Sequence, residues 1–313
     1  MKNPTSDEKI LAALAHASVI LTFFGPVGPA AIWAFQRGKS KYVRFHALQA
    51  MGFQAYLFWL WMIGMFLFFF VLFGLLIVVE FAFADQANKA AMMSPFIIQP
   101  IFFLFIFGSW GIFFLGGFLG ALFCMLNRDF RYPIIGSWLK KKLLDSQTND
   151  AEFEKWEENW VSGICHSTVI LRFWGIATPL TLWLLQKDNS AKIRFQALQA
   201  TLYQLLAIAA SIVTTMVGMA VYILFIVVLA VGVNSASPTT DGEMPAWLGA
   251  ISIVFIGVFM LYGLVSFVIV PVYYLMALIG SFRIINGHEF HYPILGDLIA
   301  KRMKPAQPEV IQP

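Results

Sequence analysis

Residues 44–50 read "RFHALQA", and residues 194–200 read "RFQALQA". The similarity extends well beyond these heptapeptides. Residues 16–54 align with residues 166–204 without a gap, and 17 of the 39 aligned positions are identical. The chain is therefore built from two copies of one unit, and its fold has to be inferred from that repeat.

The first apolar block of each copy, at 10–35 and 160–185, is interrupted by proline and glycine. The interruptions read "GPVGP" and "GIATP", which stop a helix. About 15 residues precede each break and reach about 22 Å, which is less than the roughly 30 Å thickness of a bilayer core. Each first block is therefore predicted to form a helical hairpin that enters the membrane and returns.

The overall composition indicates an integral membrane protein. Hydrophobic residues make up 59% of the chain, charged residues 12%, and the mean hydropathy is +0.75. No water-soluble fold buries that much apolar surface. Each copy has two more apolar blocks long enough to span a bilayer, at about 47–80 and 96–126 in the first copy and 197–231 and 247–281 in the second.

Each copy closes on a matching segment, "FRYPIIG" at 130–136 and "FHYPILG" at 290–296. Apolar residues at helical spacing follow both segments, next to basic residues, so an amphipathic helix lying on anionic lipid is predicted after each. The arginines that open the two heptapeptides are also expected among headgroups. The predicted lipid-headgroup contacts are Arg44, Arg194, Lys140, Lys141, Lys142, Lys301, Arg302 and Lys304.

The distribution of basic residues favours two parallel copies. If both ends of each hairpin face the cytoplasm, the inside segments carry 19 of the 21 lysines and arginines. An inverted second copy would send its basic loops outside, against the positive-inside rule. We therefore expect a multi-pass protein of a prokaryotic inner (plasma) membrane, with both termini cytoplasmic.

The predicted fold class is all-α: a polytopic membrane protein with two parallel repeats. Each repeat has a broken helical hairpin, two long transmembrane helices and a C-terminal amphipathic interfacial helix. The expected boundaries are a first repeat at 1–145, an acidic cytoplasmic linker at 146–159, a second repeat at 160–304 and a disordered tail at 305–313.

These features resemble a known family. The motifs are a histidine in the first arm, Pro-x-x-x-Trp in the return arm, Phe-x-Ala-x-Gln-Ala opening the next helix, and the closing Tyr-Pro. Together they look like the bacterial membrane domain of unknown function related to the twenty-kilodalton channel subunit of the chloroplast inner-envelope protein translocon. The resemblance covers nearly the whole chain, in tandem, and implies a translocation role only by analogy.

Polar side chains in the apolar segments are the candidate functional residues, because such groups are costly in a membrane. The histidines of the first arms either act chemically or donate a hydrogen bond to a carbonyl freed by the break. The polar residues of the next helix either tie helices together or line a solute path. The full set is His16, His166, His46, Gln196, Gln49, Gln199, Gln54 and Gln204.

The sequence shows no catalytic or metal-binding motif around these residues. Cys124 and Cys165 occupy unmatched positions and form no Cys-x-x-Cys, so neither a disulfide scaffold nor a zinc site is expected. No catalytic residue, metal or cofactor is predicted, and the basic residues lie beside apolar segments, which favours lipid over nucleic acid.

We therefore expect a non-enzymatic scaffold, assembly or translocation-type module for other membrane components. The alternative is a carrier or channel with a polar path between the repeats. A water-accessible stripe along His16, Gln49 and Gln54 would favour the carrier, and a dry interface would favour the scaffold.

Overall fold

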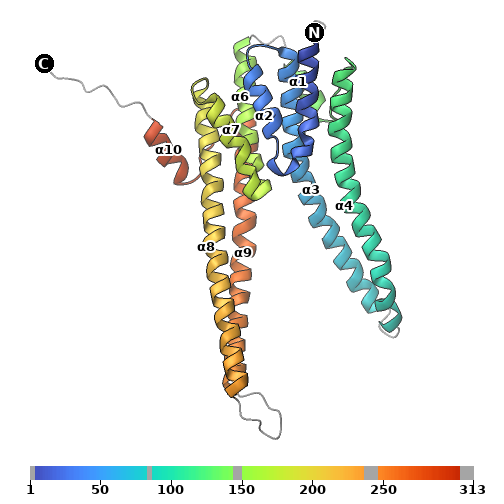
Figure 1. The fold of residues 1–313 in the computed structure, drawn as a ribbon, viewed down its shortest axis with the longest axis vertical. Coiled ribbons are helices and arrows are strands. Elements are labelled where there is room, and N and C mark those ends of the chain that lie inside the picture. The colour runs from blue at the N-terminus through green and yellow to red at the C-terminus, as the bar shows by residue number, and fades with distance from the viewer. Residues whose placement is uncertain (1–3, 83–86, 144–149, 236–245, 304–313) are drawn as a thin grey trace, which may run out of the picture.

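A computed structural model describes residues 4–82, 87–143, 150–235 and 246–303, and every regular element in these ranges is a helix (Figure 1). The first repeat comprises α1 (Ser6–Ala17), η1 (Ser18–Phe24), α2 (Val27–Gln36), α3 (Lys41–Ala82), α4 (Ala87–Met125) and α5 (Ile135–Leu143). The second comprises α6 (Asp150–Ser167), η3 (Thr168–Ile176), α7 (Ala177–Gln186), α8 (Ala191–Ser235), α9 (Ala246–Ile285) and α10 (Leu295–Met303). The expected tail at 305–313 lies outside the described residues.

Both first blocks form hairpins, as predicted, and the entry of these hairpins into the membrane stays a prediction. The chain turns at Leu21 (φ −87°, ψ 30°) and Gly25 (φ +63°) in the first repeat, and at Arg172 (φ 51°, ψ −119°) in the second. The return arms α2 and α7 run back beside α1 and α6 (Figure 1). A capping box starts α1, with the Glu8 N–H donating to Thr5 Oγ1 at 3.3 Å.

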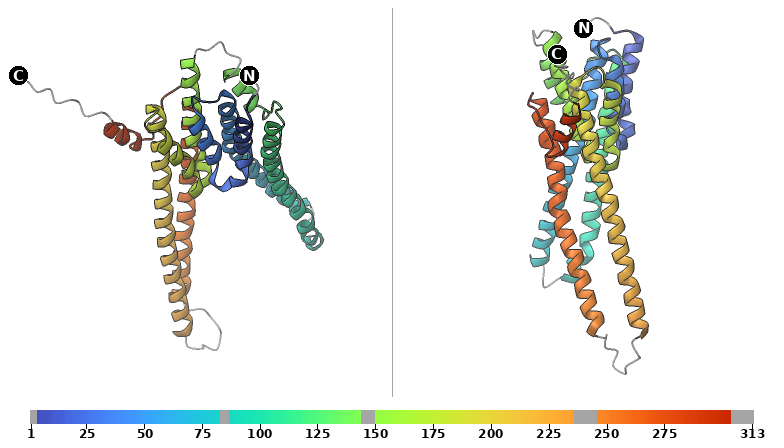
Figure 2. Two further views of the ribbon diagram at one scale, coloured as in Figure 1. Left: turned by 45° about the horizontal axis from the view of Figure 1, so that its top comes forward. Right: turned by 90° about the vertical axis from the view of Figure 1, so that its left-hand side faces the viewer.

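The long helices of the two repeats point the same way. Figures 1 and 2 show α3 with α4, and α8 with α9, running away from the end of the molecule that carries both hairpins. In the described part of the chain, five helical stretches are long and apolar enough to cross a membrane. One of them, Ala151–Gln186, is bent back on itself at Arg172 and forms the second hairpin.

The core occupies one end of the molecule, which we call the head: the hairpins together with the first turns of α3 and α8. Residues 43–52 of α3 are all buried, whereas most of the residues of α3 beyond 60 are exposed. Trp33 and Leu48 of the first repeat share one cluster with Ile164 and Leu182 of the second. Apolar packing in the head therefore joins the two repeats.

The described part of the expected linker is helical. Residues 150–159, expected in a linker, form the first turns of α6. The Trp138 ring of α5 meets Trp156 edge to face and Trp160 at a tilt. The helix α5 is thus packed between α3 and α6, whereas α10 contacts α8.

Candidate functional site

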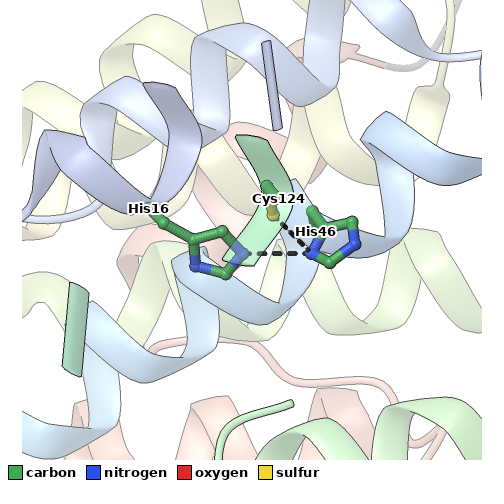
Figure 3. Close-up of side chains that lie close together, drawn as sticks. All are labelled: His16, His46 and Cys124. Carbon is green, nitrogen blue, oxygen red and sulfur yellow. Dashed lines mark hydrogen bonds between the residues drawn. The ribbon is translucent and has the colours of Figure 1, made fainter. Parts of the chain in front are cut away.

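Four polar side chains from four parts of the first repeat meet in the head. The His16 ring lies between two partners, with Nδ1 2.9 Å from the Tyr132 hydroxyl and Nε2 3.1 Å from His46 Nδ1. The Cys124 Sγ approaches the same His46 Nδ1 at 3.4 Å (Figure 3). All four side chains are buried, with 2% exposure or less. We call this group the first-repeat cluster.

The second repeat keeps half of this arrangement. His166 Nδ1 lies 3.0 Å from the Tyr292 hydroxyl, as in the first repeat, but His166 Nε2 faces the Gln196 Oε1 at 3.0 Å. The position of Cys124 is taken by Ile284, which is fully buried. The second-repeat cluster, His166, Gln196 and Tyr292, therefore holds one imidazole and no thiol.

In the first repeat, Gln49 of the heptapeptide makes two hydrogen bonds to the backbone of the closing segment, and we call this arrangement the clasp. The Tyr132 N–H donates to Gln49 Oε1 at 2.8 Å, and Gln49 Nε2 donates to the Phe130 carbonyl at 3.2 Å. The Tyr132 ring stacks on Phe53 with 3.8 Å between centroids. These contacts position the hydroxyl that meets His16.

The second repeat has the same clasp. The Tyr292 N–H donates to Gln199 Oε1 at 2.8 Å, Gln199 Nε2 donates to the Phe290 carbonyl at 3.3 Å, and the Tyr292 ring stacks on Tyr203 at 3.7 Å. Burial raises the pKa of Tyr132 and of Tyr292, so both hydroxyls stay protonated and available as hydrogen-bond donors.

Close approach of α4 to α1 depends on a glycine. A Cβ placed on Gly120 would lie 2.8 Å from the His16 ring. Gly116 and Gly120 have the Gly-x-x-x-Gly spacing that is typical of closely packed membrane helices. The packing brings Cys124, one turn further along, to the histidines.

The carbonyls freed at the hairpin breaks are satisfied by glutamine and hydroxyl groups. Gln54 Nε2 donates to the Ala15 carbonyl at 3.3 Å and to Ser18 Oγ at 3.1 Å. Gln204 Nε2 donates to Thr168 Oγ1 at 3.4 Å. The expected carbonyl partner of the histidines is therefore wrong, since both imidazoles pair with tyrosine hydroxyls and with the next helix.

A buried ion pair links the two repeats. Both nitrogens on one edge of the Arg44 guanidinium bond to the Glu157 carboxylate, with Nε to Oε1 at 2.9 Å, and Trp33 Nε1 donates to the same Oε1 at 2.7 Å. This arrangement corrects the expectation that Arg44 contacts headgroups, because its side chain is only 7% exposed and paired with a carboxylate. The matching Arg194 is half-buried, and its Nε has no hydrogen-bond partner among the described residues.

The other predicted headgroup residues that the structure describes lie in α5 and α10. Lys141, Lys142, Lys301 and Arg302 are exposed, and Lys140 is half-buried. Lys304 lies outside the described residues. Headgroup contact by these side chains stays a prediction.

Sequence reasoning missed four members of these sites, one of which is Cys124, set aside because it forms no Cys-x-x-Cys. Tyr132 and Tyr292 belong to the closing segment, whose repetition was the available signal. Glu157 has an acidic counterpart at Asp7 before the first block, but its partner Arg44 is 113 residues away, so nothing local indicated the pair.

Comparison with known proteins identifies the family. The model of the magnetosome magnetite crystal formation protein family matches residues 7–139 and again residues 157–299, one match for each repeat. Neither the search of curated proteins nor the search of solved structures found a match. A relation to the chloroplast translocon subunit gains no support from these comparisons and stays a prediction. The two matches cover most of the chain, and it belongs to this family of bacterial membrane proteins, which is not a known enzyme family.

Proposed function

We propose that the protein is a non-enzymatic scaffold that holds or assembles other components of the membrane in which magnetite crystals form. Family membership supports the location, since the family is described by magnetosome crystal formation. The observation that carries the scaffold role is that polar side chains of the head are buried and bonded to one another or to the backbone. His16 and Gln49 are fully buried, Gln54 is 1% exposed, and each is hydrogen-bonded within the chain.

The length of the exposed apolar surface supports a position for the head relative to the membrane. Residues 205–231 of α8 are mostly exposed and apolar and cover about 40 Å at 1.5 Å per residue. That length already exceeds the roughly 30 Å hydrocarbon core. In our proposal these lower parts of the long helices cross the bilayer, and the polar clusters lie in the head, at the level of one membrane surface.

The hairpin tips mark the boundary of that head. Phe24 and Trp174 pack edge to face at the two tips, with 4.9 Å between ring centroids, and both are exposed. Aromatic side chains of this kind are typical of the membrane interface. The basic loops around Lys39 and Asn189 lie at the other ends of the return arms, in contact with the cytoplasm and anionic headgroups in our proposal.

The carrier is the second candidate, and one observation favours it. Gln54 Oε1 and Gln204 Oε1 are buried and have no hydrogen-bond partner among the described residues. A solute that enters the head would find these two acceptors near the hairpin breaks.

Water access to Gln54 separates the two candidates. In the scaffold, a cysteine at Gln54 in a background without Cys124 and Cys165 stays unmodified by a small water-soluble thiol reagent, whereas a control cysteine at exposed Lys39 reacts fully. Both variants are compared by thermal unfolding in mild detergent to verify that they are folded. Rapid modification at Gln54 in folded protein would overturn the scaffold and favour the carrier.

The scaffold role has its own test in magnetosome-bearing cells. The tagged chain is expected to co-purify in mild detergent with a defined set of magnetosome membrane proteins, and loss of the chain is expected to remove those proteins from the membrane. An unchanged membrane composition in cells that lack the chain would contradict the role.

A further inference from the structure

Three ligand atoms in the first-repeat cluster converge as metal ligands do. A nitrogen of His16, a nitrogen of His46 and the Cys124 sulfur all lie within 4.8 Å of one another. A tetrahedral ion with bonds of about 2.0 to 2.1 Å to nitrogen and 2.3 Å to sulfur holds its ligands about 3.3 to 3.6 Å apart. The His16 Nε2 to His46 Nδ1 distance of 3.1 Å and the Cys124 Sγ to His46 Nδ1 distance of 3.4 Å are close to that spacing (Figure 3).

One tautomer of His16 suits a ligand. When Nδ1–H donates to the Tyr132 hydroxyl 2.9 Å away, the lone pair of Nε2 points at the cluster. A ligating histidine typically donates its other ring N–H to such an outer partner, which fixes the ring orientation. Tyr132 is itself held by Gln49 and Phe53, so the outer shell is rigid.

The second repeat is an internal comparison that lacks these properties. Gln196 Nε2 donates to the Phe290 carbonyl, which turns Gln196 Oε1 toward His166. An amide oxygen there requires a proton on His166 Nε2, so no lone pair faces the cluster. With Ile284 in place of the thiol, the second-repeat cluster keeps the histidine–tyrosine contact of the first repeat without its ligand set.

A fifth polar side chain, Tyr42, borders the first-repeat cluster. The Tyr42 ring packs on His46 with 4.5 Å between centroids, and its hydroxyl interacts with the Cys124 sulfur. This hydroxyl is buried without a well-formed hydrogen bond to any described residue. The side chain is half-buried, so it separates the thiol from the surface of the head.

We infer that the first repeat binds one divalent transition-metal ion of the zinc class through His16 Nε2, His46 Nδ1 and Cys124 Sγ. Two imidazoles and a thiolate are ligands of intermediate softness, which favours Zn²⁺ and Co²⁺ over Mg²⁺ and Ca²⁺. Three protein ligands leave the fourth position for water or another donor. The inference departs from the expectation of no metal, which rested on sequence motifs, and it does not depend on the scaffold role.

Binding of the metal ion releases one proton. The ion replaces the proton of the Cys124 thiol, which leaves to solvent, while both imidazoles bind as neutral ligands through lone pairs. Metal affinity is therefore expected to fall about tenfold for each unit of pH decrease wherever the free thiol is protonated.

The experiment is a Co²⁺ titration of the full chain in mild detergent, purified with a tag that contains no histidine. We expect one equivalent to bind with a thiolate-to-Co²⁺ charge-transfer band and the visible bands of a tetrahedral ion, both of which Zn²⁺ displaces. His46→Gln and Cys124→Ile install the residues of the second repeat, so the variants are expected to fold. They lower the affinity by more than the about 10- to 100-fold typical of losing an outer-shell partner.

Two further variants test the assignment. Cys165→Ala removes the other buried cysteine and keeps the band. Tyr132→Phe keeps the band and weakens binding about 10- to 100-fold. The inference is overturned if wild-type protein gives no band, if Cys124→Ile retains it, or if Cys165→Ala abolishes it in protein that unfolds at the wild-type temperature.

Discussion

The two repeats share a clasp and differ in what the clasp holds. In both, a glutamine of the long helix grips the closing segment and a tyrosine hydroxyl meets the histidine of the first arm. The contents then diverge, since His46 and Cys124 of the first repeat correspond to Gln196 and Ile284 of the second. The clasp is therefore the structural part of the repeat, and the side chains of the cluster that it positions can differ between the copies.

The buried ion pair between the repeats also has no counterpart at the matching positions of the described structure. Glu157 of the second repeat is buried against Arg44 and Trp33 of the first, whereas the matching Arg194 and Asp7 form no such pair in the described structure. The second repeat therefore contributes the carboxylate and the first repeat the guanidinium. Because both repeats lie in one chain, these two roles are always assigned to the same copies.

The largest predicted effect comes from breaking that interface. Glu157→Gln leaves the buried Arg44 charge without a counter-ion and is expected to cost about 3 to 5 kcal/mol of unfolding free energy. The matched control is Glu158→Gln, which removes a partly exposed pair with Arg37 and should cost at most about 1 kcal/mol. Unfolding in mild detergent, followed by tryptophan fluorescence, measures both. Equal losses of unfolding free energy in the two variants would show that the buried Glu157 pair stabilises the protein no more than the partly exposed Glu158 pair.

An intermediate effect is expected from opening the clasps. Gln49→Ala and Gln199→Ala each leave the N–H of a buried tyrosine unsatisfied, which costs about 1 to 3 kcal/mol in addition to lost packing. Because the geometry is the same in both repeats, the two losses should agree within about 1 kcal/mol when measured without metal. A loss confined to one repeat would contradict the shared structural role.

The smallest effect concerns the backbone after α4 and α9. Asn127 adopts φ 56° where the second repeat has Gly287 at φ 84°. Asn127→Gly is expected to stabilise the protein by less than about 1 kcal/mol, and Gly287→Asn to destabilise it by a similar amount, because glycine tolerates the left-handed region best. The same unfolding assay applies, and a destabilising Asn127→Gly together with a stabilising Gly287→Asn would contradict this explanation.

The repeat, the hairpins and the parallel long helices were predictable because the alignment of the two copies, the helix-breaking residues and the distribution of basic residues are all visible in the sequence. Proline and glycine break the first blocks, and the repeat shows that the break occurs twice. The partners of Arg44 and Cys124 were not predictable, since they are set by helix packing over 113 and 78 residues of separation. A basic residue that opens an apolar helix suits a headgroup and a buried carboxylate equally well, and only the fold decides between them.

The central claim is that two parallel repeats place both hairpins and both polar clusters at one side of the membrane. Its most direct test is labelling of single cysteines with an impermeant maleimide in sealed vesicles, in a background of Cys124→Ile and Cys165→Ala. Cysteines at Lys39 and Asn189, both exposed beside the return arms, are predicted to label from the same side, and cysteines at Phe81 and Ala246, at the far ends of α3 and α9, from the opposite side. Labelling of Lys39 and Asn189 from opposite sides would contradict the parallel arrangement and favour inverted repeats with alternating access.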